Sequence, residues 1–409
     1  MLDLIDVVTG FELNKGLEKV IKMDTWNRSQ IEQYQHEKFE KLKFYASKSD
    51  NYRGCQTWNL KDFPKYPLEL YRNHPEKFRT NFRKIYAERL TSGSTGTPKK
   101  VFVSKEMLEA KRVSYLKMLH WHNLKLTDCE VYIGGDIINF KTKIYYYFKN
   151  KIYLTSFNID KETARHYIKK INRSRPKIIF SYPHSLHVIL NYAEELNLSV
   201  FQPELVYTGA ELLYPETMQI IKRHFPESHL ANEYWATEGN IGVTCPEGNM
   251  HVDEDTVMVE VDNVDDNGVG DLLLTNLFSY DFPIIRYPLG DKIKLSDKLC
   301  NCGRKTKVIE KMEGRSGDFF YRPDGRCIAY LDTRIAKFTN SAVIIFQLIY
   351  HKEKDRMLLN YIPKKGKNNI DKEGLTKYFK KYLDLDLAFE ETDKIEFNKS
   401  GKYQPFISV

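Results

Sequence analysis

The sequence predicts an α/β protein with a large N-terminal domain of layered sheets and helices and a small α+β C-terminal domain. Two observations support this fold class. Strand and helix patterns alternate through the middle of the chain, and 409 residues exceed what one hydrophobic core usually serves. We expect the large domain over residues 1–316, with a helical region over 1–89, and the small domain over 317–409.

The N-terminal region favours helices. Residues 17–47 are charged and aromatic with helical spacing, which predicts one or two helices. Residues 62–81 are rich in proline and charge and predict an irregular connection. Ser104 precedes Lys105-Glu106 and is a typical N-cap for a helix that runs to about His120.

The middle of the chain alternates short apolar runs with helical patterns. The expected strands are 130–134, 177–180 and 204–207. The expected helices are 161–172, one that begins near residue 183, and 215–224. This alternation predicts a layered fold with a largely parallel sheet.

Beyond about Thr256 the pattern becomes β-rich, with expected strands at 257–261 and 272–275. A break falls near residues 313–318. After it, a strand pattern over 342–350 and a basic helix over 372–382 predict the small domain.

Composition excludes several function classes. The net charge of +8 comes from 63 basic and 55 acidic residues spread along the chain, so we expect no nucleic-acid partner, although anionic ligands are favoured. No apolar run reaches membrane-spanning length, and Met1–Asp6 lacks the pattern of a signal peptide. Six cysteines do not suggest a disulfide scaffold. We expect a cytoplasmic protein.

A run of hydroxyl and glycine residues from Thr91 to Thr97 ends in Lys99 and Lys100. Glycine lets backbone N–H groups turn toward an anion, and hydroxyls and lysine add donors and positive charge. The run is not a Walker P-loop, because only two residues separate Gly93 from Gly96. It predicts a different kind of phosphate-binding loop.

Further motifs follow this loop in a fixed order. They are Tyr207–Glu211, Asn232–Gly239, Ile285–Asp291, residues 314–318 and Lys399–Lys402. Together the series resembles that of the adenylate-forming enzymes, the superfamily of acyl-CoA synthetases, adenylation domains and luciferases. Within it the chain is similar to the phenylacetate–CoA ligase group and its shorter capsule-biosynthesis-like relatives. That similarity rests on Phe180–Leu186, Arg286-Tyr287, Cys300–Arg304 and Glu313–Ser316.

The resemblance implies a reaction in two steps. A carboxylate attacks the α-phosphate of ATP to give acyl-adenylate and pyrophosphate, and a thiol or other nucleophile then takes the acyl group and releases AMP. Such chemistry depends on neutralising charge at phosphorus. The implied cofactors are therefore ATP, Mg²⁺ and, for the thiol, CoA.

The resemblance also implies roles for individual residues. The loop Ser92, Gly93, Ser94, Thr95, Gly96 and Lys99 would hold the β- and γ-phosphates. Thr237 would contact the α-phosphate and Glu238 would bind Mg²⁺. The expected nucleoside contacts are Gly209, Ala210 and Glu211 at the border of adenine, Tyr234 stacked on adenine, Asp291 on the ribose and Arg315 near it. Lys402 would bridge carboxylate and α-phosphate in the first step.

Two positions depart from the family pattern. The hinge aspartate of the family is replaced by Gly317, with Asp318 next, which leaves the pivot of the small domain undefined. The residue after the stacking tyrosine is Trp235 instead of glycine. The expected pocket residues are Trp235, Tyr132, Gly134 and Tyr182. A tryptophan there fills much of an aryl-sized pocket, which favours a small carboxylate; alternatively, the backbone shifts and Trp235 forms one wall of a larger pocket.

Cys245 and His251 are separated by five residues, and Cys300 and Cys302 form a second close pair. Four such ligands suit tetrahedral Zn²⁺, and a site with four protein ligands would be structural. The alternative is four unconnected buried residues. Relatives in the resembled group share a cysteine/histidine cluster in this region.

Three functions stay open at this point. The leading hypothesis is an ATP-dependent acid–thiol ligase with a small carboxylate substrate and CoA as acceptor. The second is an adenylation enzyme that loads an amino or other small acid onto a carrier-protein thiol or a polymer precursor. The third is a nucleotide-binding protein without turnover. The sequence defines neither the acid nor the oligomeric state.

Overall fold

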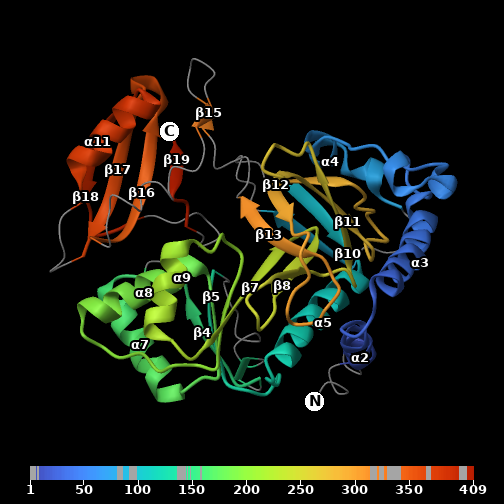
Figure 1. Cartoon of the computed structure of the whole chain (residues 1–409), viewed down its shortest axis with the longest axis horizontal. Coiled ribbons are helices and arrows are strands. Elements are labelled where there is room, and N and C mark those ends of the chain that lie inside the picture. Colours follow the sequence, from blue (N-terminus) through green and yellow to red (C-terminus); the bar gives the residue numbers. More distant parts are fainter. Residues whose placement is uncertain are drawn as a thin grey trace. The chain divides into compact units, whose positions relative to one another are not determined.

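The computed structural model describes residues 6, 9–80, 86–91, 99–135, 144, 146–147, 149–156, 159–313, 320–321, 327–328, 342–364, 370–395 and 403–409. The chain forms two compact units (Figure 1). The first combines Met1–Leu126 with Ala231–Ser316, and the second combines Thr127–Leu230 with Gly317–Val409. Among the described residues, no helix has both the length and the apolar character needed to cross a membrane.

Helices form the N-terminal part of the first unit. They are α2 (Leu13–Met23), α3 (Arg28–Ala46), α4 (Leu68–Asn73) and α5 (Lys105–Trp121), with 3₁₀ turns at Cys55–Thr57, Leu60–Asp62 and Pro75–Phe78. The two predicted N-terminal helices and the Ser104 cap are confirmed, since Ser104 Oγ accepts a hydrogen bond from Met107 N–H at 3.1 Å. The prediction that 62–81 is irregular is wrong, because Pro67 starts α4 instead of breaking a helix.

The first unit contains an antiparallel sheet with strand order β10-β11-β12-β13-β9-β8-β7. Its strands are β7 (His229–Ala236), β8 (Gly239–Thr244), β9 (Met250–Val252), β10 (Val257–Asp262), β11 (Gly270–Asn276), β12 (Tyr287–Leu295) and β13 (Val308–Glu313). A separate hairpin pairs β1 (Ala87–Thr91) with β2 (Lys99–Val103).

This sheet corrects one prediction. The β-rich region begins near residue 229, well before Thr256. The strand pattern of β7 and β8 is weak because polar residues such as Asn232, Glu233 and Asn240 and the glycines 239 and 242 interrupt it. Those interruptions belong to one of the motifs noted above.

The second unit contains the parallel sheet that the sequence predicts. Its order is β4-β3-β5-β6, with β3 (Glu130–Gly134), β4 (Lys151–Thr155), β5 (Ile178–Ser181) and β6 (Leu205–Thr208). The helices α7 (Lys161–Ser174), α8 (Pro183–Glu195) and α9 (Pro215–His224) gather together beside it (Figure 1). Every residue of β5 and β6 is buried, as expected for parallel strands covered by helices.

A second sheet in the same unit has the order β18-β17-β16-β19. Its strands are β16 (Val343–His351), β17 (Arg356–Pro363), β18 (Asp386–Glu391) and β19 (Phe406–Ser408). Helix α11 (Lys372–Tyr378) continues as a wider turn over Phe379–Leu383 and packs its apolar side on this sheet. Two-residue strands β14 (Phe320–Tyr321) and β15 (Cys327–Ile328) pair with each other. A small-domain boundary at residue 317 stays a prediction.

The two sheets of the second unit share a hydrophobic core. Residues of α7, α8, α9 and the parallel strands pack in one cluster with Ile344, Ile345 and Ile395. Buried apolar contacts therefore join Ile344, Ile345 and Ile395 to the α8 region.

Candidate functional site

The hairpin of the first unit holds both ends of the predicted phosphate loop. Thr91 pairs with Lys99 across β1 and β2. The predicted phosphate contacts Ser92, Gly93, Ser94, Thr95 and Gly96 lie outside the described residues, as do Arg315 and Lys402.

Two predicted nucleoside contacts meet in the first unit. Tyr234 lies on β7 and Asp291 on β12, and the Tyr234 hydroxyl donates a hydrogen bond to the Asp291 carboxylate. The Asp291 carboxylate is almost fully buried, with 6% of the residue exposed. Both residues belong to the sequence motifs, but only the folded structure shows that they are in direct contact.

Glu238 lies in the turn between β7 and β8 and is 3% exposed. The Tyr287 hydroxyl donates to Glu238 Oε1 at 3.0 Å, and the Asn276 amide donates to the Glu238 carbonyl at 2.7 Å. A Cβ on the following Gly239 would lie 2.9 Å from that Asn276 nitrogen, so a side chain there would have to displace the amide that bonds the Glu238 carbonyl. Thr237 is half-buried in the same turn. The turn therefore presents an oriented carboxylate, the type of ligand that Mg²⁺ takes together with phosphate oxygens.

The Tyr287 ring is itself held in an aromatic cluster. It lies edge-on to Tyr71, with ring centroids 4.7 Å apart, and Tyr71 stacks on Phe78 at 3.9 Å. The sequence analysis noted the Arg286-Tyr287 pair without giving Tyr287 a role. The structure shows that it orients Glu238.

Trp235 is half-buried on β7. The ammonium of Lys111, on α5, lies 3.2 Å from the centroid of the indole ring. Such a cation over an indole face is an attractive contact. Nothing in the sequence pattern singles out Lys111, because the contact joins residues more than a hundred positions apart.

In the second unit, Gly209, Ala210 and Glu211 follow β6 directly. Ala210 has φ of 70°, in the left-handed region that residues with a side chain rarely adopt. The Glu211 carboxylate contacts His184 Nδ1 at the start of α8 and accepts a hydrogen bond from the Tyr403 N–H at 2.9 Å. Non-glycine residues in this region often mark functional turns.

Three predicted pocket residues lie around the ends of β3 and β5. The Tyr132 ring stacks on Phe180 at 4.6 Å, and a Cβ on Gly134 would lie 2.5 Å from that tyrosine ring. Tyr182 N–H donates to Ile133 O at 3.4 Å. Tyr132, Gly134 and Tyr182 are therefore neighbours, and their role in substrate binding stays a prediction.

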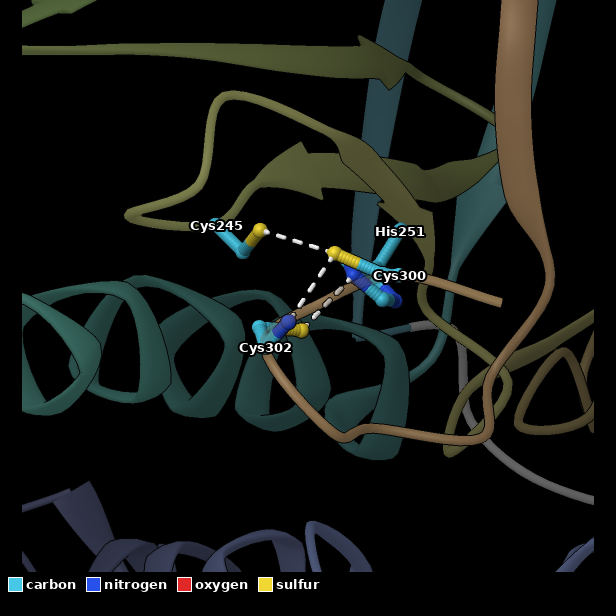
Figure 2. Close-up of side chains that lie close together, drawn as sticks. All are labelled: Cys245, His251, Cys300 and Cys302. Atoms are coloured by element: carbon cyan, nitrogen blue, oxygen red, sulfur yellow. Dashed lines mark hydrogen bonds between the residues drawn. The ribbon is translucent and has the colours of Figure 1, made fainter. Parts of the chain in front are cut away.

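The four predicted metal ligands form one cluster in the first unit (Figure 2). The ligand atoms of Cys245, His251, Cys300 and Cys302 all lie within 4.8 Å of one another. Cys245 follows β8, His251 lies on β9, and the other two lie in the loop before β13. The alternative of four unconnected residues is excluded. Three sulfurs and one imidazole nitrogen are a donor set that Zn²⁺ prefers.

The surroundings of the cluster suit metal binding. Thr306 Oγ1 lies 2.8 Å from His251 Nδ1, while His251 Nε2 faces Cys302 Sγ at 3.2 Å. Burial, together with the charges of Arg304 and Lys117, lowers the pKa of His251 to about 4, so the imidazole is neutral at pH 7. A neutral imidazole whose second nitrogen has a hydrogen-bond partner is the usual form of a ligating histidine.

The cysteine thiols of the cluster differ in the direction in which their pKa is shifted. Burial raises the pKa of Cys245 to about 12 in the metal-free protein. Burial also acts to raise the pKa of Cys300, but hydrogen bonds, first from the Cys302 N–H, bring it below its ordinary value. A bound Zn²⁺ would favour the thiolate at every position.

A frame of polar contacts ties the cluster to the N-terminal helices. Asp24, at the end of α2, accepts hydrogen bonds from Trp121 Nε1 at 2.8 Å and from Arg304 Nε at 3.0 Å. The Arg304 guanidinium lies 4.1 Å from the Trp121 ring centroid, and that ring lies edge-on to His251. Arg304 follows Cys302 closely in the chain, so the same loop carries metal ligands and this ion pair.

The comparisons with known proteins agree with the fold. The family model described as AMP-binding enzyme matches residues 29–265. The chain is 23% identical over 397 residues to Protein CapK of Staphylococcus aureus, with 90% of this chain and 87% of CapK covered.

Solved structures with the same fold include 2-hydroxyisobutyryl-CoA ligase in its postadenylation state with R3-HIB-AMP. The TM-score is 0.73 at 14% identity, and the match covers 95% of this chain and 91% of the ligase. The same ligase with 2-HIB-AMP and CoA in the thioesterification state gives 0.60 at 15% identity, with the same coverage. The predicted α/β fold is thereby confirmed.

Proposed function

Because the chain belongs to the AMP-binding enzyme family, we propose that it is an AMP-forming ligase that activates a small carboxylic acid and passes the acyl group to a thiol, first of all CoA. The observation that carries this proposal is the pair of buried, tyrosine-bonded carboxylates of the first unit, Asp291 on β12 and Glu238 in the turn between β7 and β8. The acyl-CoA ligases of similar fold add support.

In the first step, a carboxylate oxygen of the acid attacks the α-phosphorus of ATP, and the bond from that phosphorus to the bridging oxygen breaks to release pyrophosphate. Glu238 would hold Mg²⁺, which when bound neutralises phosphate charge. Thr237 would lie at the α-phosphate and the loop 92–98 would hold the outer phosphates. Lys402 would neutralise charge between the acid and the α-phosphate.

The nucleoside would be held by Tyr234 and Asp291 from the first unit, with Gly209, Ala210 and Glu211 at the border of adenine. In the second step the thiol sulfur attacks the acyl carbon, the bond from that carbon to the AMP oxygen breaks, and the thiol proton goes to solvent. Arg315 would lie near the ribose. These roles rest on the family motifs and on the contacts described above.

We propose that the acid is small because of Trp235. Its indole is large and is held in place by the Lys111 ammonium at 3.2 Å, so the ring is a fixed wall. Tyr132, Gly134 and Tyr182 would complete the pocket. Replacing Trp235 with glycine removes the wall and should widen the range of acids toward longer and aromatic ones. An unchanged acid profile in Trp235→Gly would overturn this part of the proposal.

We propose that the Cys/His cluster holds a structural Zn²⁺. Four protein ligands leave no open position for a substrate, so the ion would fix the loop before β13 to the hairpin β8–β9. We further propose that residues 1–316 and 317–409 act as the two domains of the enzyme, with the pivot at Gly317 or Asp318.

The test is carboxylate-dependent exchange between ATP and pyrophosphate, measured over a panel of small, aromatic and amino acids, with Lys402→Ala as control. Exchange with a small acid that is lost in the variant supports the proposal. Exchange with aryl acids alone supports adenylation but rejects the proposal that Trp235 restricts the pocket to small acids. The absence of exchange with every acid would favour a nucleotide-binding protein without turnover.

The acceptor is tested separately. CoA-dependent release of AMP supports an acid–thiol ligase. AMP release that needs a carrier-protein thiol or a polymer precursor instead of CoA would assign the chain to the loading enzymes.

A further inference from the structure

Arg304 lies beside the Cys/His cluster and is held there from two sides. Its Nε and Nη2 atoms donate to the two carboxylate oxygens of Asp24 at 3.0 and 3.2 Å. The Arg304 and Asp24 side chains are 16% and 21% exposed, so this ion pair lies largely out of water. The Trp121 ring centroid lies 4.1 Å from the guanidinium, and Trp121 Nε1 donates to the same carboxylate at 2.8 Å. The plane and the position of the guanidinium are therefore both fixed.

Asp24 lies where a carboxylate is otherwise unfavourable. It is the C-cap residue of α2, and the helix dipole disfavours negative charge at that end of a helix. Its carboxylate accepts hydrogen bonds from Arg304 and from Trp121 instead. The position of Asp24 is thus explained by its contacts with these two residues and not by the needs of α2.

The ion pair turns its positive end toward the cluster. Arg304 follows Cys302 by two positions, and its guanidinium acts on the Cys302 sulfur as a hydrogen-bond donor and as a positive charge. The contacts with Asp24 use two of the five N–H donors of the guanidinium, so donors remain for the sulfur. Arg304 and Asp24 also act on His251 in opposite directions, and the effect of Arg304 is the larger.

A metal ion in this cluster would leave a negative charge to be compensated. Zn²⁺ with three thiolates and a neutral imidazole carries one net negative charge. A charge that is taken out of water is costly unless an opposite charge or a hydrogen bond meets it. Lys117, a second cation near His251, donates to Asp253 and Asp255 at 2.8 Å each, so its charge is already offset.

We propose that Arg304, oriented by Asp24, is a positioning residue of the metal centre that compensates the charge on the Cys302 thiolate and slows the release of Zn²⁺. This inference rests on the proposed structural Zn²⁺. A hydrogen bond from a cation to a ligating thiolate stabilises the charged form that binds the metal. Residues that bond to metal ligands in this way typically change metal affinity by about tenfold to a hundredfold.

The experiment measures the transfer of Zn²⁺ from the purified full chain to a chromogenic chelator in Arg304→Gln and in Arg286→Gln. Arg286 is the matched control, because it forms a similarly buried ion pair with Glu260 in the same unit, at 3.1 Å and with side chains 13% and 23% exposed. Zn²⁺ should leave Arg304→Gln between about tenfold and about a hundredfold faster than it leaves the wild type. Arg286→Gln should stay within about twofold of the wild type, since Arg286 bonds to Glu260 and to backbone carbonyls instead of metal ligands.

Asp24→Asn gives a second test. The amide keeps an acceptor but loses the charge that fixes the guanidinium, so Zn²⁺ release should speed up by a smaller factor than in Arg304→Gln. Because Asp24 acts through Arg304, adding Asp24→Asn to Arg304→Gln should accelerate release no further. Effects that add in the double variant would overturn the assigned role of Asp24.

The spectrum of the Co²⁺-loaded protein separates a direct effect on the thiolate from a general loosening of the loop. Without the Arg304 donor the Cys302 sulfur is more electron-rich, so the sulfur-to-metal charge-transfer band should move to longer wavelength in Arg304→Gln. An unchanged rate of Zn²⁺ release overturns the inference, and so does faster release with an unchanged band. A wild type that binds neither Zn²⁺ nor Co²⁺ rejects the proposed metal site itself, whereas a wild type that retains its ion no better than Arg304→Gln rejects the role of Arg304 alone.

Discussion

Two places in this molecule join segments that are far apart in the sequence, and they do so by different chemistry. In the first unit, the Cys/His cluster brings together two hairpin residues and a loop about fifty positions later. In the second unit, polar contacts join Glu211, after β6, to Tyr403 and join Glu194, on α8, to Lys364. Soft donors around one point suit a permanent joint, whereas polar pairs suit a joint that can open and re-form.

The magnitudes support this distinction. A structural Zn²⁺ in small peptides contributes about 10–16 kcal/mol of folding free energy. A hydrogen bond to a charged group contributes about 1.5–3 kcal/mol.

The largest effect should come from removing the proposed Zn²⁺. Prolonged chelation, or Cys302→Ser, should lower the melting temperature by more than about 10 °C, since a loss of about 5 kcal/mol in a unit of this size shifts it by about 10–20 °C. Differential scanning calorimetry with metal analysis measures this. The control is Cys55→Ser, a buried cysteine outside the cluster.

Purified protein with less than about half an equivalent of zinc, or chelation without a thermal shift, would show that the cluster works without metal. In that case the Cys/His cluster would not be the more permanent of the two connections.

A smaller effect is expected from Lys364→Met. The methionine keeps the apolar stem but leaves Glu194 and Asn191 without their buried partner, which should cost about 1–3 kcal/mol of stability. Urea unfolding of the purified variant measures the loss, and its zinc content should equal that of the wild type. A loss of stability as large as that from metal removal would mean that the contact of Lys364 with Glu194 is not the more easily opened of the two connections.

The smallest effect is expected from Glu194→Gln, and it depends on pH. Burial acts to raise the pKa of Glu194, but hydrogen bonds from Lys364 and Arg223 outweigh it and lower the pKa to about 2. The ionised carboxylate therefore contributes stability above its ordinary pKa of 4.5, and this contribution is lost as the pH falls through about 2.

The Glu194→Gln variant should accordingly be less stable than the wild type by about 1 kcal/mol at pH 7, after allowance for solvent screening. The difference should shrink at pH 3. Urea midpoints at the two pH values test this, and a difference that grows at pH 3 would contradict the assigned partners.

Much of the fold follows from local pattern. The alternation in residues 130–224 predicts the parallel half of the second unit, and Ser104 predicts the start of α5. The cysteine and histidine spacing suggested the cluster that the structure assembles. Each of these signals lies within a short stretch of chain, where periodicity and cap chemistry act.

The remaining features depend on long-range contacts that periodicity does not encode. Tyr287 on Glu238, Lys111 on Trp235 and Asp24 on Arg304 each join residues from separate segments. The antiparallel β7–β9 region was not predicted because its motif residues interrupt the strand pattern. The contact of His184 with Glu211 likewise comes only from the packing of β6 beside β5 and of α9 beside α8.

The order in which the chain visits its two units has a consequence for biosynthesis. The chain passes between units after Leu126, Leu230 and Ser316. On the ribosome, residues 1–126 meet the rest of their unit only after residues 231–316 have emerged, and Thr127–Leu230 meets the rest of its unit only after the segment from Gly317 has emerged. At about 5–20 residues per second, the first segment of each unit waits for roughly 10–40 seconds before its unit is complete. Nascent chains stalled between residues 126 and 230 should therefore bind chaperones and be cut by proteases.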